Sequence, residues 1–64
     1  MAYRIYGSYK KGRFKAMDIG AGVQVNNLIY ATIYWDEEEQ YARSVVESIS
    51  KDNPDWEFEL RKVG

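Results

Sequence analysis

Hydrophobic and polar positions follow two different periods along this chain, and the clearer one is helical. Within residues 37–51 an apolar side chain recurs at i, i+3, i+4 and i+7, which is the spacing of one stripe along a helix. The four positions are Ala42, Val45, Val46 and Ile49. The pattern predicts an amphipathic helix over residues 37–51 that packs on an apolar surface.

Four acidic residues stand where this helix should begin. Asp36 is a good N-cap, and Glu39 three residues later completes a capping box. Glu37 and Glu38 fall in the first turn, where the positive end of the helix dipole favours carboxylates. The acidic run is therefore predicted to start the helix, with contact to a partner as a second role. Pro54 ends the helix.

The stretch after the proline alternates with period two. Trp56, Phe58 and Leu60 are separated by charged residues, which is typical of a half-buried strand with its aromatic face toward the core. We expect this strand and the helical stripe to cover each other.

Three strands are predicted ahead of the helix. Residues 2–9 and 13–19 form a hairpin in which Gly12 supplies the positive φ of the turn. Residues 20–27 are either a long connection or an extension of that hairpin. The third strand covers residues 28–35, with one set of side chains facing the helix and the other facing away. The helix-facing set is Ile29, Ala31, Ile33 and Trp35, and the other set is Leu28, Tyr30, Thr32 and Tyr34.

The resulting order is β-β-β-α-β. It predicts an α+β fold of two layers, in which one helix packs on one face of an antiparallel or mixed four-stranded sheet. A meander places the third strand parallel to the first, and a right-handed crossover through the helix lays the last strand parallel to an earlier one. The expected sheet order is 4-1-2-3.

Composition fits a small folded protein. The chain has 64 residues, so we expect a single globular domain over residues 1–64. Hydrophobic residues make up 45% of it, which separates it from disordered tails. No segment has the run of about twenty apolar residues that a membrane helix needs, and no secretory signal is evident, so a cytoplasmic location is expected.

Charge divides the chain into a basic and an acidic half. Residues 1–34 carry a net charge of +4, and residues 35–64 carry −5. Either the two halves attract each other within the domain, or they form two poles that a partner can sense.

The sequence contains few of the residue types that catalysis or metal binding requires. The chain contains no histidine and no cysteine, so the usual proton-transfer and nucleophilic groups are missing. Three consecutive glutamates on a helix point in different directions and do not form a cation loop. The sequence predicts a protein that is not an enzyme and takes no metal or cofactor.

Protein binding is the preferred interpretation. If the third strand faces the helix as described, Tyr30 and Tyr34 lie on the uncovered sheet face with Tyr6. Tyrosine offers a large contact area at small entropic cost, so this face, or the acidic helix end at Asp36, Glu37 and Glu38, is expected to bind a protein partner or a second copy.

Single-stranded nucleic acid is the alternative partner. Aromatic side chains on an open sheet stack bases, and flanking cations hold phosphates. The cations in question are Arg4, Lys10, Lys11, Arg13 and Lys15. The sequence pI of about 5.3 favours the protein-binding interpretation.

One resemblance points the same way. The stretch ATIYWDEEEQYARSVVESISKDNPDWEFELRKV resembles the strand, acid-capped helix and charged final strand of many small proteins from bacterial phages and other mobile elements. The resemblance implies an accessory protein that acts by binding a host or phage component. Some proteins of that kind inhibit host defence complexes, CRISPR effectors included, by presenting acidic side chains to nucleic-acid-binding surfaces.

Overall fold

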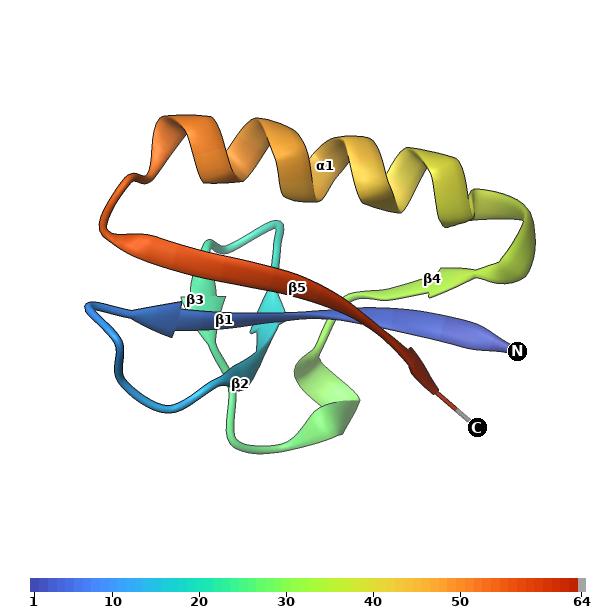
Figure 1. Ribbon diagram of the computed structural model, residues 1–64. Coiled ribbons are helices and arrows are strands. Elements are labelled where there is room, and N and C mark those ends of the chain that lie inside the picture. The colour runs from blue at the N-terminus through green and yellow to red at the C-terminus, as the bar shows by residue number, and fades with distance from the viewer. Residues whose placement is uncertain (64) are drawn as a thin grey trace.

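A computed structural model describes residues 1–63, and it shows an antiparallel sheet of five strands with one helix packed against it (Figure 1). The strands are β1 (Ala2–Tyr9), β2 (Lys15–Asp18), β3 (Val23–Gln24), β4 (Ile33–Trp35) and β5 (Trp56–Val63). Two single-turn 3-10 helices, η1 (Leu28–Tyr30) and η2 (Asp36–Glu38), flank β4, and η2 leads directly into α1 (Glu39–Asp52). The predicted α+β class is confirmed, with one strand more than expected.

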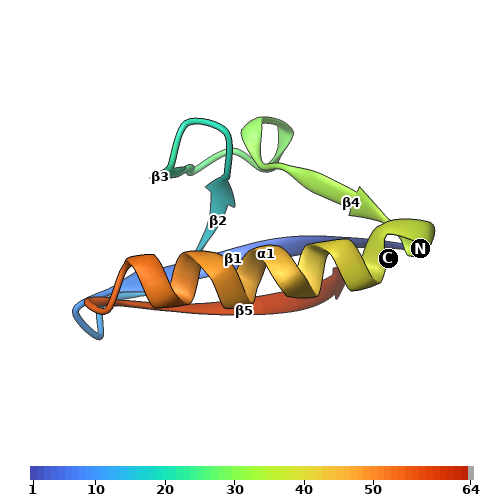
Figure 2. The ribbon, with the colours of Figure 1, turned by 90° about the horizontal axis from the view of Figure 1, so that it is seen from above.

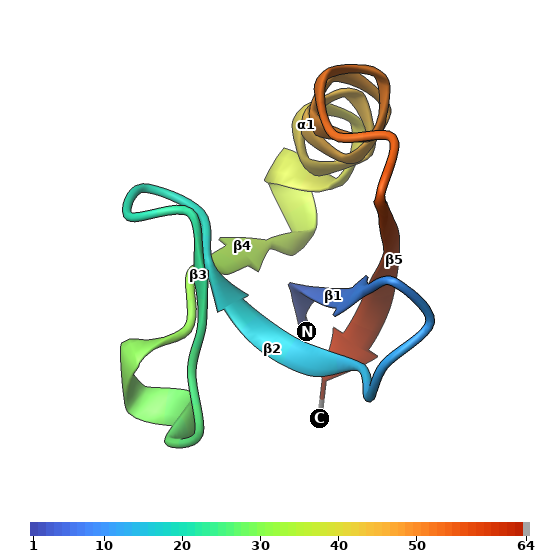
Figure 3. The same cartoon turned by 90° about the vertical axis from the view of Figure 1, so that its left-hand side faces the viewer.

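Strand β1 is the centre of the sheet. Along one edge it pairs with β5 over all eight residues, from Ala2 opposite Val63 to Tyr9 opposite Trp56. Along its other edge β4 pairs with the first part of β1, and β2 pairs with Tyr6 and Gly7. Seen from one end, β5 and the β2–β3 pair rise on either side of β1 (Figure 3). The helix lies above β1 and β5, as the view from above shows (Figure 2).

The expected sheet order is right for two neighbours and wrong for the third. The last strand does lie beside the first, and the first beside the second. The third predicted strand, however, pairs with β1 rather than β2, and it runs antiparallel to β1. The reason is β3, which pairs with β2 and adds one reversal of the chain. Because β4 and β5 are both antiparallel to β1, they run parallel to each other, so the last strand is parallel to an earlier one as predicted. It is antiparallel to its neighbour β1, however, whereas the predicted meander made those two strands parallel.

The core lies between α1 and the concave face of the sheet. Ala42 and Ile5 are completely buried, and the remaining helical stripe packs against the same cluster. The buried set is Tyr3, Ile5, Met17, Tyr34 and Ala42, and the partly buried hydrophobic residues around it include Val45, Val46, Ile49, Trp56, Phe58 and Leu60. The predicted stripe and the predicted apolar face of β5 are therefore confirmed.

The turn after β1 is tighter than expected. Lys10 and Lys11 have φ of 48° and 61°, and the N–H of Gly12 donates to the carbonyl of Tyr9 across 2.9 Å. Two consecutive positive φ angles closed by such a bond define a type I′ turn. The prediction that Gly12 supplies the positive φ is wrong, because the two lysines take the left-handed positions.

Segment 28–35 departs most from the prediction. Only Ile33–Trp35 form a strand, and Leu28–Tyr30 form the η1 turn. Tyr34 lies opposite Tyr3 on β1, and paired residues in a sheet share a face, so Tyr34 points into the core. Ile33 and Trp35 consequently point outward. The predicted assignment of faces is inverted for these three residues.

Candidate functional site

Tyr34 does not belong to any accessible surface. Only 7% of it is exposed, and its ring packs 6.0 Å from that of Tyr41, centroid to centroid. Burial raises the pKa of the Tyr34 phenol, with smaller contributions from Tyr41 and Glu38. Its role is in the core, and the prediction that it forms a binding face is wrong.

Tyr6 is on the opposite face of the sheet from Tyr34. It alternates with Ile5 along β1, and the Arg61 guanidinium covers its ring at 4.2 Å from the centroid. The same guanidinium lies 5.6 Å from the ring centroid of Phe14. Tyr6 is thus half-buried within an Arg61 stack, and the predicted tyrosine face does not form.

Residues 28–35 instead carry the largest concentration of exposed hydrophobic side chains. Ile29 is 77% exposed, Tyr30 65% and Trp35 55%. The complete set, which we name the 28–35 patch, is Leu28, Ile29, Tyr30, Ile33 and Trp35. Half of the large exposed hydrophobic residues that the structure describes fall within this set. Single exposed apolar residues are ordinary, whereas five of them within eight residues of chain make this segment the candidate for an interaction surface.

The backbone of this segment is held in place by polar contacts. Asn27 accepts a hydrogen bond at Oδ1 from the N–H of Ile29 at 3.1 Å, which starts the η1 turn. The N–H of Thr32 donates to the carbonyl of Met17 at 3.0 Å, and the Thr32 hydroxyl accepts from the N–H of Ile19 at 2.9 Å. The polar groups therefore bind the segment to β2 while the apolar side chains stay in water.

The acidic residues begin directly after Trp35, at the end of the patch. Asp36, Glu37 and Glu38 are all exposed. The N–H of Trp35 donates to Oε1 of Glu38 at 3.0 Å. This is one half of a capping box, displaced by one residue from the predicted pair of Asp36 and Glu39, so that prediction is wrong in register.

Glu39 has a different set of partners. It accepts from the Tyr3 hydroxyl at 2.9 Å, and its Oε2 accepts from Arg43 Nε at 3.0 Å and Nη2 at 2.8 Å. The Arg43 hydrogen bonds, followed by that of Tyr3, lower the pKa of Glu39. Glu39 is committed to these contacts, whereas Asp36 pairs with the amino group of Met1 at 3.2 Å.

The predicted nucleic-acid residues are spread over two places. Lys10, Lys11, Arg13 and Lys15 are exposed around the connection between β1 and β2. That connection lies at the opposite end of β1 from the acidic turn (Figure 1). Arg4 lies within β1 opposite Arg61, and its Nε is buried with no hydrogen-bond partner among the described residues. The five cations therefore do not make one surface with the tyrosines.

The basic connection also has contacts within the protein. The N–H of Lys10 donates to the carbonyl of Asp55 at 2.8 Å, which places the segment before β5 against the turn. The Lys10 ammonium lies 5.4 Å from the Tyr9 ring centroid, and Lys15 donates to Oδ1 of Asn26 at 3.2 Å. Part of the positive charge thus has partners within the protein.

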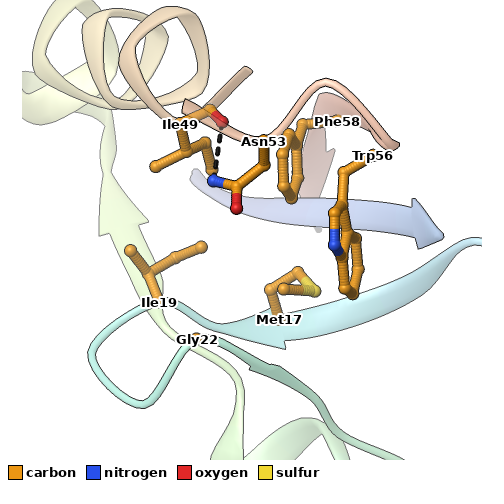
Figure 4. A pocket seen from close by; sticks show the side chains of 7 residues that line it. All are labelled: Met17, Ile19, Gly22, Ile49, Asn53, Trp56 and Phe58. Carbon is orange, nitrogen blue, oxygen red and sulfur yellow. Dashed lines mark hydrogen bonds between the residues drawn. The ribbon is translucent and has the colours of Figure 1, made fainter. Parts of the chain in front are cut away.

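A small pocket opens between the C-terminal end of α1 and strands β2 and β5 (Figure 4). Its volume is about 120 Å³, and it is lined by Met17, Ile19, Gly22, Ile49, Asn53, Trp56 and Phe58. Asn53 donates through Nδ2 to the carbonyl of Ile49 at 2.9 Å. Ligand sites usually measure about 300–1,000 Å³, and none of these lining side chains titrates near neutral pH. The pocket suits a few waters or one inserted side chain.

Other kinds of site find little support in the described residues. Within residues 1–63, no three histidine, cysteine or acidic side chains come together as metal ligands would. No helix in that range is long and apolar enough to span a membrane. The chain matches no protein-family model, no curated protein and no solved structure.

Sequence reasoning missed Ile29, Ile33 and Trp35 as surface residues, whereas Leu28 was correctly placed in the set that faces away from the helix. In an unbroken apolar run, period-two alternation assigns two faces but does not say which one is covered. The available signal was Asn26 and Asn27, because an asparagine that caps a turn ends the extended backbone that the strand prediction required.

Proposed function

We propose that this protein is a non-enzymatic binding module that contacts another protein through the 28–35 patch. The observation that carries the proposal is the exposure of Ile29, Tyr30 and Trp35 on a segment whose backbone is fixed to β2. A rigid backbone with exposed aromatic and aliphatic side chains loses little conformational entropy on binding. Tryptophan and tyrosine are also the residue types most enriched at energetically important interface positions.

The partner surface follows from the charges next to the patch. Trp35 is followed at once by Asp36, Glu37 and Glu38, so carboxylates border the apolar contact. A complementary surface has an apolar centre with lysine or arginine beside it, because charge complementarity at the rim raises association rates and selects partners. A phage or mobile-element accessory protein that covers a basic surface of a host complex would act in this way.

Nucleic acid is the less favourable partner for the same surface. Phosphates would be repelled by Asp36, Glu37 and Glu38, and the basic connection after β1 lies at the other end of the molecule (Figure 1). Single-strand binding requires aromatic and basic groups along one groove. Binding at the basic connection alone is the alternative that the experiment below separates.

The proposal is tested by affinity capture from a lysate of the source organism, with and without nuclease, using three forms of the immobilised protein. The first is the native chain. The second carries Ile29→Ser and Trp35→Ser in the patch. The third carries Lys10→Glu and Lys11→Glu in the basic connection. Any protein captured by the native chain is then purified, and its affinity for each form is measured directly.

The patch variant should weaken that affinity by at least about thirtyfold, because truncated hot-spot residues typically cost 2 kcal/mol or more. The lysine variant should bind as the native chain does. The matched control is Val23→Ser, which removes an exposed apolar side chain outside the patch. Capture that disappears with nuclease, or that fails in the lysine variant alone, would establish nucleic-acid binding and overturn the proposal.

A further inference from the structure

Strand β5 has a complete unpaired edge. β1 occupies its other edge over all eight residues, and no other strand within residues 1–63 pairs with β5. About half of the N–H and C=O groups of an edge strand point away from its neighbour, and they must bind water or another chain. An edge of this length is a ready template for an added strand.

The usual protection of such edges is weak here. Edge strands are commonly kept short or interrupted by proline or a bulge, whereas β5 pairs with β1 without interruption from Trp56 to Val63. The remaining protection is charge. Lys62 lies exposed on the concave face, and Glu57, Glu59 and Arg61 lie on the convex face. Glu59 and Arg61, with side chains 43% and 45% exposed, form an ion pair with each other.

These charges are self-complementary under twofold symmetry. Two antiparallel copies of β5 related by a twofold axis perpendicular to the sheet keep their convex faces on the same side. When the axis passes through Leu60, Glu59 of each copy lies opposite Arg61 of the other. Opposite charges at directly paired positions stabilise a sheet, and this register contains two such pairs.

The concave face is compatible with the same register. Leu60 lies opposite Leu60 of the second copy, and Phe58 lies opposite Lys62, whose aliphatic stem can cover the ring. The neighbouring register, centred on Glu59, brings that carboxylate against itself, which is unfavourable for directly opposed like charges. The Leu60-centred register is therefore the preferred one.

We propose that two copies of this protein pair through the free edges of β5 to form one continuous sheet with both helices on the same side. β4 and β5 flank β1 on opposite edges, so this contact leaves the 28–35 patch free. The inference does not depend on the proposed function. Each can fail without the other.

Analytical ultracentrifugation and native mass spectrometry of the purified chain test the pairing. The native chain should sediment as a dimer in equilibrium with monomer. Glu59→Arg places four arginines along the contact, and Arg61→Glu places six glutamates there, Glu57 of each copy included. Each single variant should raise the dimer dissociation constant by at least about tenfold, because two attractive pairs become repulsive.

Mixing the two variants provides the deciding measurement. Glu59→Arg and Arg61→Glu chains should form a heterodimer in preference to either homodimer, which native mass spectrometry resolves by mass. Arg61→Glu also loses the stack on Tyr6 and Phe14, so circular dichroism is recorded for each chain. Recovery of a dimer on mixing shows that both chains are folded.

The inference is wrong if the native chain remains monomeric at high micromolar concentration. It is also wrong if both single variants dimerise as the native chain does. The double variant Ile29→Ser with Trp35→Ser serves as the control and should dimerise normally. Loss of the dimer in that variant alone would assign self-association to the 28–35 patch instead of β5.

Discussion

The hydroxyl of Tyr3 on β1 donates a hydrogen bond of 2.9 Å to Oε1 of Glu39, the first residue of α1. Arg43, one turn later, holds the other carboxylate oxygen of Glu39. The start of the helix is thereby joined to the central strand by a charged group with three hydrogen bonds. The pKa values of Tyr3 and Glu39 are both shifted in the folded protein, so its stability should depend on pH in two separate ranges.

In acid, Glu39 should contribute stability that is lost on protonation. Its pKa is lowered in the folded state, chiefly by Arg43 and then by Tyr3, relative to 4.5 in the unfolded chain. The contribution is therefore complete above pH 4.5 and disappears as the pH falls through the lower, folded value. Urea unfolding of the native chain and Glu39→Gln between pH 6 and pH 3 should converge toward low pH. If the free energies of unfolding of the two proteins instead differed by the same amount at every pH, the prediction would be wrong.

At alkaline pH, the stabilising contribution of Tyr3 should be lost as the pH rises, whereas that of Glu39 is lost as the pH falls. The hydrogen bond to Glu39, followed by burial, raises the pKa of Tyr3 above 10.0. Its stabilising contribution is present below pH 10 and is lost as the pH rises through the higher, folded value. Tyr3→Phe removes the titrating group, so the stability difference from the native chain should shrink above pH 10. Tyr30→Phe, on an exposed ring, is the control.

The two tyrosines of segment 28–35 should respond differently to truncation. Tyr34→Ala should lower the free energy of unfolding by about 3 kcal/mol or more, because it leaves a cavity in the core. Tyr30→Ala should change it by less than about 0.5 kcal/mol, since that side chain is 65% exposed. Chemical denaturation measures both. Equal effects would mean that the assignment of faces in β4 is wrong.

Gly7 is required by close packing. A Cβ at this position would lie 2.9 Å from Sδ of Met17 and 3.0 Å from two ring carbons of Phe58. Gly7→Ala should therefore destabilise the protein by about 1–3 kcal/mol, which is the usual effect of overpacking a core. Gly20→Ala, where the nearest atom is 3.6 Å away, is the matched control and should be nearly neutral in a thermal melt.

The turn after β1 can be improved. Lys10 and Lys11 occupy left-handed positions that asparagine and glycine adopt more easily. Lys10→Asn with Lys11→Gly should raise the free energy of unfolding by about 0.5–1 kcal/mol. Lys10→Gln with Lys11→Gln removes the same charges without relieving the backbone and should show little gain. A similar gain in both variants would assign the effect to charge.

The helix and the final strand could be predicted because each exposes one face to water. Val45 and Ile49 repeat with the helical period, and Phe58 and Leu60 alternate with charged residues. The contrast between apolar and charged positions therefore identifies the face of each element that packs against the core. Segment 28–35 offers no such contrast. There the face was decided by the pairing of Tyr34 with Tyr3, a contact across the sheet that local periodicity does not contain.

The candidate site was predicted in part for the same reason. Asp36 to Glu38 are exposed as expected, because polar groups at a helix start remain in water. Tyr30 is also exposed as expected, but it lies in the η1 turn and not on the predicted strand face. Trp35 was assigned to the helix-facing side because it shares the period-two position of Ile29, Ala31 and Ile33 in the predicted third strand. Its exposure follows from its position next to Tyr34 in a strand of three residues.

The pairing of β1 with β5 also determines when the protein can fold. These strands come from nearly opposite ends of the described chain, yet they share the longest ladder of the sheet. During synthesis, β1 cannot pair with β5 until Val63 has left the ribosome. Bringing the two strands together also closes the loop formed by the residues between them, which costs conformational entropy before any contact is gained. Folding should be late and highly cooperative, and any interruption of translation before β5 should leave a chain with an open central strand.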